Sequence, residues 1–240
     1  CSLIISKIIG IRNRYLLVHH EANTFFPFMK WFNKKVDKLV SQSVSKIICV
    51  SRATKDSLKK NRFLNLKNKN YVVIHNSLEI KKIKKEPKFN LRNFYNINKK
   101  KILIGIVSRV EPYKGHTELL LSLSKMHKSE LSKLHILIIG KGNLEYLKYL
   151  KNLNYNLKLD QNVFFTGYLS ASSEKIISQL DLLINPTQTF EGYGLSILEA
   201  INVKTPVIAT DVGAVREVFG NNNIMLARKK DINSLKEKIL

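Results

Sequence analysis

The chain has 240 residues, of which 44% are hydrophobic and 25% are charged, and this balance favours globular domains over intrinsic disorder. No stretch approaches the roughly 20 consecutive apolar residues that cross a bilayer, and no signal peptide opens the chain, so we expect a cytoplasmic protein. The two cysteines, Cys1 and Cys49, have neither metal-ligand spacing nor the density of a disulfide scaffold. Cys49 lies in an apolar run and is expected in a core.

The positive charge is unevenly distributed along the chain. The formal net charge is +23, and residues 1–100 hold 23 Lys or Arg against 5 acids, whereas residues 101–240 hold 18 against 13. Lys, Asn and Ile are abundant throughout, as an AT-rich coding sequence would produce, and composition alone explains part of the excess. A basic first region also suits an anionic membrane surface, a phosphorylated acceptor or nucleic acid.

The first 80 residues show strand signals at Tyr15–Val18, 47–50 and 71–74. Ser51 is placed to cap a helix over residues 52–60. Three strands are too few for a finished sheet layer, and the chain begins with Cys instead of Met. We therefore expect a fragment that lacks the start of its first domain.

An aromatic and lysine-rich segment lies within this region, at residues 25–38. Such a mixture can lie in a membrane interface, with rings at the headgroups and lysines on anionic lipid. A helix that packs into the first domain with its lysines outward is the alternative. Membrane contact is therefore one of two open interpretations.

The next stretch, residues 79–100, is polar and contains Pro87. We expect a linker at residues 81–98 with a short helix around residues 91–95. This divides the chain into a partial first domain at 1–80 and a second domain at 99–240.

From Lys101 onward, short β-branched runs alternate with helical patterns in the order that builds a parallel sheet. Apolar helical faces recur at Leu119, Leu120 and Leu123, and again at Ile176 and Ile177. The pattern predicts a doubly wound α/β domain, which binds ligands at the carboxyl ends of its strands. The expected strands are residues 102–107, 136–139, 163–165, 182–185, 207–210 and 224–226.

The most informative segment is residues 185–200, which run from a strand end through a glycine-containing loop into a helix. Glu191 falls in the loop and Glu199 in the helix. Gly192 and Gly194 allow the backbone to approach a ligand, and the helix start offers unpaired N–H groups to a phosphate. A helix N-terminus with a favourable acid nearby is the alternative.

A second candidate site lies at the end of the strand 102–107, where Arg109 and Lys114 could clamp a diphosphate. Surface cations are common in this chain, so solvated side chains are the alternative. Gly140-Lys141-Gly142 matches neither the dinucleotide nor the P-loop fingerprint, which disfavours both of those sites.

In this order the segments resemble the retaining glycosyltransferases of family 4, which have the GT-B fold of two Rossmann-like domains facing a cleft. The family's two Glu residues, separated by seven residues, are met by Glu191 and Glu199, and its phosphate loop by Ser108-Arg109 and Lys114-Gly115. The resemblance covers about residues 15–240. Its other matches are Ile139-Gly140-Lys141-Gly142, Phe165-Thr166-Gly167, the run 206–210, and Gly213 with Glu217.

In the first domain the family's strand followed by His resembles residues 18–21, so either His19 or His20 is the residue that lies beside the transferred sugar in this family. Ser77 replaces the glycine that usually follows Asn76, a departure from the family pattern. The family's first strand and glycine loop would precede Cys1.

The resemblance implies transfer of a sugar from a nucleotide diphosphate sugar to a hydroxyl of a glycan or lipid-linked acceptor, as in polysaccharide biosynthesis. The sequence contains no visible metal-ligand cluster, so we expect neither a metal nor a further cofactor. From the lack of an apolar span and the basic first region we expect a cytoplasmic enzyme that can be peripheral at the inner face of the membrane, with no specific nucleic-acid partner. The catalytic candidates are Glu191, His19 and His20. The donor-binding candidates are Arg109, Lys114, Gly192, Tyr193, Gly194, Leu195 and Glu199.

Two other functions fit parts of the sequence. A non-catalytic basic module that binds nucleic acid or anionic surfaces would use the first region, but its basic residues form no recognisable nucleic-acid motif. An enzyme of the same fold that acts on a soluble acceptor, as sucrose- or trehalose-type enzymes do, is the other alternative.

Overall fold

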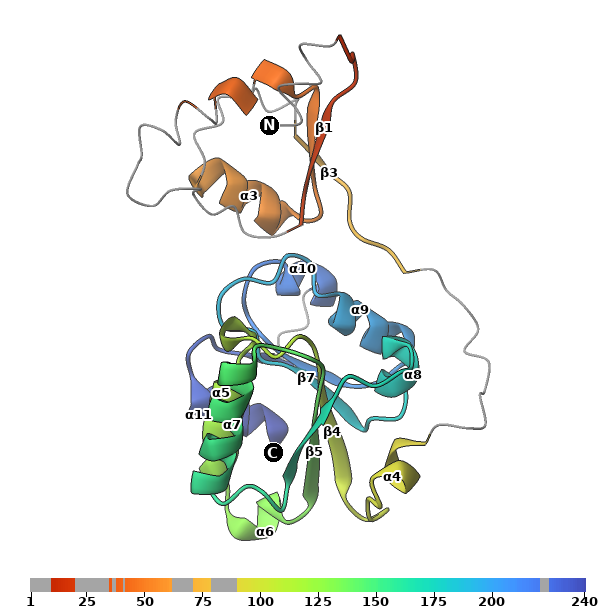
Figure 1. Cartoon of the computed structure of the whole chain (residues 1–240), viewed down its shortest axis with the longest axis vertical. Coiled ribbons are helices and arrows are strands. Elements are labelled where there is room, and N and C mark those ends of the chain that lie inside the picture. The colour runs from red at the N-terminus through yellow and green to blue at the C-terminus, as the bar shows by residue number, and fades with distance from the viewer. Residues whose placement is uncertain are drawn as a thin grey trace. The chain divides into compact units, whose positions relative to one another are not determined.

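A computed structural model describes residues 10–19, 35, 38–40, 42–61, 71–78, 90–220 and 225–240. The chain divides into two compact units, Cys1–Ser77 with Phe190–Tyr193, and Leu78–Thr189 with Gly194–Leu240 (Figure 1). Most of the segment 25–38, for which membrane contact and a packed helix were both left open, lies outside the described residues. No helix within the described ranges is long and apolar enough to cross a membrane.

The first unit contains a parallel sheet in the order β1-β2-β3, formed by Tyr15–Val18, Lys46–Cys49 and Tyr71–Val73. Helix α3, Arg52–Asn61, follows β2. Ser51 begins it as predicted, because its Oγ accepts a hydrogen bond from the Thr54 amide at 3.0 Å. The core of this unit is one cluster of buried side chains that β2, β3 and α3 share with the segment before β2: Val44, Ile47, Cys49, Leu58 and Tyr71.

The second unit contains a six-stranded parallel sheet in the order β6-β5-β4-β7-β8-β9. Counted from β4 this is the order 3-2-1-4-5-6, in which the direction of winding reverses between β4 and β7 and a ligand crevice is expected at their carboxyl ends. The doubly wound domain predicted from the sequence is confirmed. The strands are β4 Ile102–Val107, β5 Leu134–Ile139, β6 Val163–Gly167, β7 Leu182–Asn185, β8 Val207–Thr210 and β9 Leu226–Ala227.

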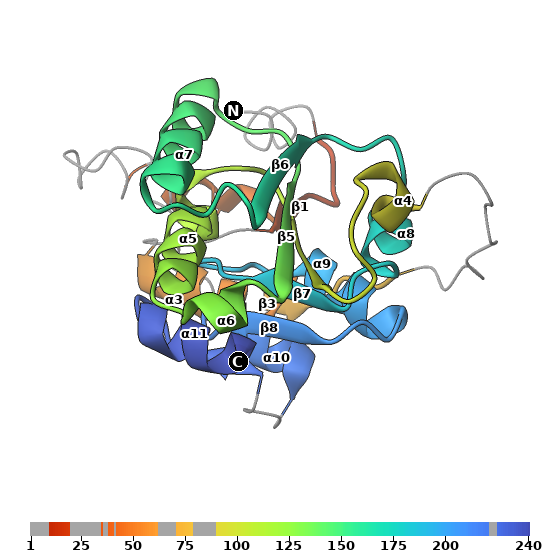
Figure 2. The same ribbon diagram turned by 90° about the horizontal axis from the view of Figure 1, so that it is seen from below.

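Helices cover both faces of this sheet (Figure 2). Because side chains alternate along a strand, Leu137 and Ile139 of β5 fall in one core cluster while Ile136 and Ile138 fall in the other. The first cluster contains residues of α8 Ser173–Ile177, α9 Leu195–Asn202 and α10 Val215–Phe219. The second contains residues of α5 His116–Ser124, α7 Leu144–Asn156 and α11 Ile232–Ile239. The short helix α6, Lys128–Leu131, precedes β5.

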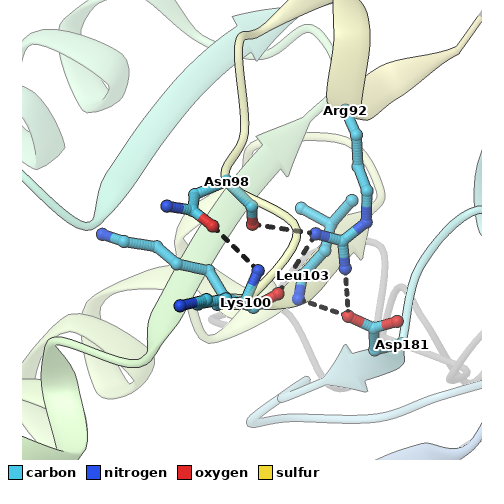
Figure 3. A network of polar contacts seen from close by, with 6 residues as sticks. Arg92, Asn98, Lys100, Leu103 and Asp181 are labelled. Carbon is cyan, nitrogen blue, oxygen red and sulfur yellow. Dashed lines mark hydrogen bonds and ion pairs between the residues drawn. The ribbon is translucent and has the colours of Figure 1, made fainter.

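Helix α4, Leu91–Phe94, is fastened to the end of the sheet opposite the expected crevice. Leu91 and Ile97 are buried in the first cluster. Arg92 donates from Nη2 to Asp181 Oδ2 at 2.5 Å and from Nη1 to the Lys101 carbonyl at 3.1 Å (Figure 3). Asp181 also accepts from the Leu103 amide at 2.7 Å, so one carboxylate joins α4 to the starts of β4 and β7.

Candidate functional site

The loops that follow β4 and β5 touch through their backbones, and glycine makes this approach possible. A Cβ on Gly140 would lie 1.9 Å from the Ser108 carbonyl oxygen, and one on Gly142 would lie 1.9 Å from the Val110 carbonyl oxygen. The Val110 amide donates to the Lys141 carbonyl at 2.8 Å. Any side chain at these two positions would push the loops apart.

The loops that follow β4 and β7 meet in the same way across the point where the winding reverses. Gly115 has a φ of +79°, and a Cβ there would lie 1.8 Å from the Pro186 carbonyl oxygen. The Gln188 amide donates to the Tyr113 carbonyl at 2.8 Å. At the carboxyl edge of the sheet, the loop after β4 therefore contacts the loop after β5 on one side and the loop after β7 on the other.

The helix starts of the second unit are of two kinds, and both kinds occur at this edge. Helices α4, α6, α7, α8 and α11 each begin at a residue whose side chain accepts a hydrogen bond from the first turn. Helices α5, α9 and α10 begin without such a side chain, and the first two start from Gly115 and Gly194 in the left-handed region. The α5 and α9 starts flank the expected crevice, and uncapped first-turn N–H groups with a positive dipole end are suited to bind an anion.

Arg109 and Lys114 are organised around one tyrosine. Arg109 lies beyond the end of β4, and Lys114 ends the 3₁₀ turn η2, Pro112–Lys114. Arg109 Nη2 donates to the Tyr113 hydroxyl at 2.7 Å, and Lys114 Nζ lies 5.6 Å from the centroid of the Tyr113 ring. The two predicted phosphate-binding cations therefore share the loop that leads into the uncapped start of α5.

The loop after β7 is a buried polar turn. Asn185 Oδ1 accepts from the Thr187 hydroxyl at 2.7 Å, and Gln188 Nε2 donates to the Pro186 carbonyl at 2.8 Å. Asn185 Nδ2 also donates to Ser196 Oγ, at 3.4 Å, in the first turn of α9. These contacts fix the loop relative to the helix start that carries the candidate site.

Glu199 lies half-buried on α9, one turn inside the helix, as the sequence predicted. Its Oε1 accepts a hydrogen bond from Ser173 Oγ at 2.6 Å. Burial raises the pKa of Glu199, the Ser173 hydrogen bond acts in the opposite direction, and the nearby Glu174 carboxylate raises it further. The acid is thus supported by α8, a helix that the sequence did not connect with it.

His116 is the first residue of α5 and is fully buried. Neither ring nitrogen makes a hydrogen bond of ordinary geometry. Burial lowers the pKa of His116 from 6.5 to about 4, although the Glu111 carbonyl favours the protonated form, and Lys114 lowers it further. His116 is therefore neutral at pH 7 and adds no charge beside the two cations.

A cavity of about 350 Å³ opens beside the carboxyl ends of β4, β5 and β6. Its walls are mainly apolar, and Lys141 and Lys151 supply positive charge. Lys141 Nζ also lies 5.3 Å from the centroid of the Tyr168 ring. An apolar cavity beside charged loops is the usual form of a small-molecule site. The lining residues are Val110, Ile138, Gly140, Lys141, Gly142, Leu144, Leu147, Lys151, Phe165 and Gly167.

The remaining predicted residues belong to the first unit. His19 is exposed directly after β1, whereas His20 lies outside the described residues. Glu191, Gly192 and Tyr193 form a loop that groups with this unit, apart from Arg109, Lys114, Gly194, Leu195 and Glu199 in the other. Inside the first unit the Gly192 carbonyl accepts from the Thr54 hydroxyl at 3.3 Å, and the Tyr193 ring lies 5.3 Å from that of His75.

Sequence reasoning missed several residues of this region. Tyr113 could have been noticed, because it stands directly before Lys114 and four residues after Arg109. Ser173 and Thr54 carried no such signal, since their partners Glu199 and Gly192 lie 26 and 138 residues away. Among the described residues no group of three or more His, Cys, Asp or Glu side chains is placed to hold a metal ion.

Comparison with known proteins places these features in one family. The O-antigen biosynthesis glycosyltransferase WclY of Escherichia coli is 30% identical over 147 residues, which are 61% of this chain and 39% of the relative. The poly(ribitol-phosphate) alpha-N-acetylglucosaminyltransferase of Staphylococcus aureus is 30% identical over 162 residues, or 63% of this chain and 31% of the relative. The chain thus spans less than half the length of these curated relatives.

The fold has a solved counterpart in HepE of Anabaena, crystallised in complex with UDP and glucose. The two match with a TM-score of 0.82 at 21% identity, over 98% of this chain and 63% of HepE. The fold is GT-B, as expected from the sequence. The profile of the family described as glycosyl transferases group 1 matches residues 87–240. The chain belongs to the glycosyl transferases group 1 family.

Proposed function

We propose that the complete protein transfers a sugar from a nucleotide diphosphate sugar to a hydroxyl of a glycan or lipid-linked acceptor, with retention of anomeric configuration. The observation that carries this proposal is the pair of uncapped helix starts, α5 and α9, at the reversal of the sheet, with Arg109 and Lys114 in the loop before α5. The names of WclY and the Staphylococcus aureus relative, and the UDP and glucose of the HepE complex, support this donor and acceptor class.

In this proposal the transition state is stabilised mainly through the leaving diphosphate. Negative charge develops on that group as the bond to the sugar breaks. Arg109, Lys114 and the first-turn N–H groups of α5 and α9 supply fixed positive potential for it, in positions that need no reorganisation during the reaction. A phosphate oxygen of the donor helps to take the proton of the acceptor hydroxyl. In this proposal these positive groups compensate the negative charge of the leaving diphosphate, and neither a metal ion nor a further cofactor is required.

The two acids have different roles. Glu199 accepts hydrogen bonds from the ribose of the donor, because a carboxylate inside the helix lies beyond the N–H groups that bind phosphate. Glu191 positions the transferred sugar, and Gly192, Tyr193, Gly194 and Leu195 are further donor-binding residues of the proposal. His19 or His20 lies beside the transferred sugar.

Calorimetry with nucleotides tests this division. Glu199→Ala is expected to weaken UDP and UDP-glucose alike, by about 1.5–3 kcal/mol or roughly ten- to a hundredfold, the value of one hydrogen bond to a charged group. Glu191→Ala should leave UDP binding nearly unchanged and reduce sugar transfer by the complete enzyme. Glu237→Ala, which removes an exposed acid of α11, is the matched control.

Three results would contradict the proposal or one of its parts. Equal weakening of UDP by Glu191→Ala and Glu199→Ala would refute the separate roles of the acids. An unchanged affinity for UDP, GDP and ADP and their sugars in both variants would reduce the pair to an ordinary charged helix entrance. A salt-sensitive complex with RNA or DNA, without any effect of nucleotide sugars, would favour the basic binding module instead.

We also propose that the protein works peripherally at the anionic inner face of a membrane. The support is the concentration of positive charge in residues 1–100, together with the acceptor class. Binding to anionic liposomes should weaken with added salt and with Lys34→Glu and Lys35→Glu combined. Equal binding to neutral liposomes would exclude an electrostatic contact.

A further inference from the structure

Helices α8 and α9 meet through two neighbouring pairs of polar side chains. Ser173 Oγ donates to Glu199 Oε1 at 2.6 Å, and Asn202 Nδ2 donates to Glu174 Oε1 at 3.4 Å. Ser173 and Glu174 are consecutive on α8, and Glu199 and Asn202 lie one turn apart on α9. The start of α8 is therefore held against the second half of α9.

These contacts place a hydrogen-bond donor, the Ser173 hydroxyl, and a negative charge, that of Glu174, near the Glu199 carboxylate. The Ser173 hydroxyl occupies Oε1 of Glu199, which restricts the rotation of the carboxylate. Asn202 holds the Glu174 carboxylate on the same side of α9, one turn away. A short hydrogen bond to a half-buried carboxylate is among the stronger polar contacts in proteins.

We propose that Ser173 is a positioning residue that holds Glu199 in the geometry for binding the ribose of the donor, and that Glu174 opposes it by like-charge repulsion. This rests on the donor site proposed above. Neither residue needs to touch the nucleotide. Ser173 favours the ionised carboxylate, which accepts from ribose hydroxyls, and Glu174 favours the protonated form, which accepts less well.

The charged residues on the elements packed most extensively against α9 can be changed one at a time. Among the described residues, these elements are α8, β7 and β8. Helix α8 contributes Glu174 and Lys175, whereas β7, β8 and the rest of α9 carry no charged residue. Burial and Glu174 raise the pKa of Glu199, and the Ser173 hydrogen bond lowers it. Removal of the Ser173 hydroxyl should therefore raise the pKa of Glu199, and removal of the Glu174 charge should lower it.

The first experiment reads Glu199 directly, by NMR titration of its side-chain carboxyl carbon in the chain without ligand. Ser173→Ala should move the titration of Glu199 to higher pH, and Glu174→Gln should move it to lower pH, because Gln still accepts from Asn202 but carries no charge. Ser173→Thr keeps the hydroxyl and should restore the original titration. Ser172→Ala is the control, since Ser172 caps α8 through the Lys175 amide but does not contact Glu199.

The second experiment measures UDP affinity by calorimetry between pH 5 and pH 8. Ser173→Ala should weaken UDP about five- to tenfold at pH 7, the size of one hydrogen bond, and should move the acid loss of affinity to higher pH. Glu174→Gln should move that loss to lower pH. In a Glu199→Gln background, Ser173→Ala should cost nothing further, because the two residues act as one unit.

Three outcomes would overturn the proposal: an unchanged Glu199 titration in Ser173→Ala, the same affinity loss in Ser172→Ala as in Ser173→Ala, or a full additional loss in the Glu199→Gln background. Failure of the donor site itself has a different signature. In that case the wild-type chain does not bind UDP, or Glu199→Ala binds it normally, while the opposed shifts of the Glu199 titration persist.

Discussion

The first 100 residues and the last 140 differ in opposite ways in glycine and in charge. The first region contains only one of the ten glycines, Gly10, but most of the excess positive charge. A Cβ on Gly10 would meet nothing within 4 Å, while Cβ atoms on Gly115, Gly140 and Gly142 would each strike a backbone carbonyl. The candidate donor site is therefore built where backbones approach closely, and charge density alone would have directed attention to the wrong region.

The largest expected effect comes from Gly115→Ala. A Cβ at this position would lie 1.8 Å from backbone at a φ of +79°, so folding should lose about 4 kcal/mol or more. Gly167→Ala is the matched control, because Gly167 has a similar φ of +69° but nothing within 4 Å, and should cost only about 1–2 kcal/mol. Urea unfolding of both variants measures the difference. Equal losses would mean that backbone strain, and not the contact with Pro186, requires glycine.

A second comparison tests whether the two sheets are stabilised separately. Leu137→Ala removes a fully buried side chain from the six-stranded sheet and should cost about 3 kcal/mol, whereas Ile47→Ala in the three-stranded sheet should cost about 2 kcal/mol, because its smaller core relaxes more easily. Native-state hydrogen exchange should show Leu137→Ala weakening β5 but not β2, and Ile47→Ala the reverse. Parallel loss in both strands would show one cooperative unit.

Acid should destabilise the second unit through its buried histidines. The pKa of His116 is lowered from 6.5 to about 4, so below pH 6.5 the unfolded chain binds a proton that the folded chain refuses. Stability is therefore lost as pH falls from 6.5 towards 4, by about 2 kcal/mol at pH 5. His116→Leu should flatten this part of a plot of unfolding free energy against pH. Burial also lowers the pKa of His135 to about 4, so the unfolding free energy of the His116→Leu variant should still fall with pH because of His135.

The smallest effect should come from the contact between α4 and the sheet. Asp181→Asn retains an acceptor for the Leu103 amide but loses the charge that faces Arg92, and the Asp181 side chain is 48% exposed. We expect a loss of about 1 kcal/mol in unfolding free energy. Asp160→Asn, at an exposed site, is the control. A loss of unfolding free energy larger than that of Leu137→Ala would mean that the Arg92–Asp181 contact, rather than core packing, is the main source of stability in the second unit.

The sequence predicted β1, β4, β7 and β8 residue for residue, whereas β5 begins at Leu134, two residues before the expected start, and β2 covers Lys46–Cys49 instead of 47–50. β4, β7 and β8 were placed correctly because strands covered on both faces appear as continuous apolar runs between turn signals. The last strand was expected at residues 224–226, but the described strand is Leu226–Ala227, since an edge strand of two residues has almost no pattern of its own. The order 3-2-1-4-5-6 followed only from the structure.

The candidate site was predictable in its parts and not in its assembly. Arg109 and Lys114 could be named because they follow the end of a strand, and Glu199 because of its spacing from Glu191. Their supports, Tyr113 and Ser173, depend on side chains that meet only after the loops and helices have packed. The glycines at 140 and 142 were noticed as a turn, but their packing against Ser108 and Val110 is a tertiary contact that no local pattern encodes.

The glycine contacts also affect how this protein can be engineered. In a saturation-mutagenesis library, Gly115, Gly140 and Gly142 would be as intolerant as reacting residues, although their requirement is steric. Fitness scores alone would therefore exaggerate the size of the chemical centre. Variation aimed at a new donor should spare these glycines and use the side chains of the neighbouring cavity, Leu144, Lys151 and Phe165, which can change without separating the loops.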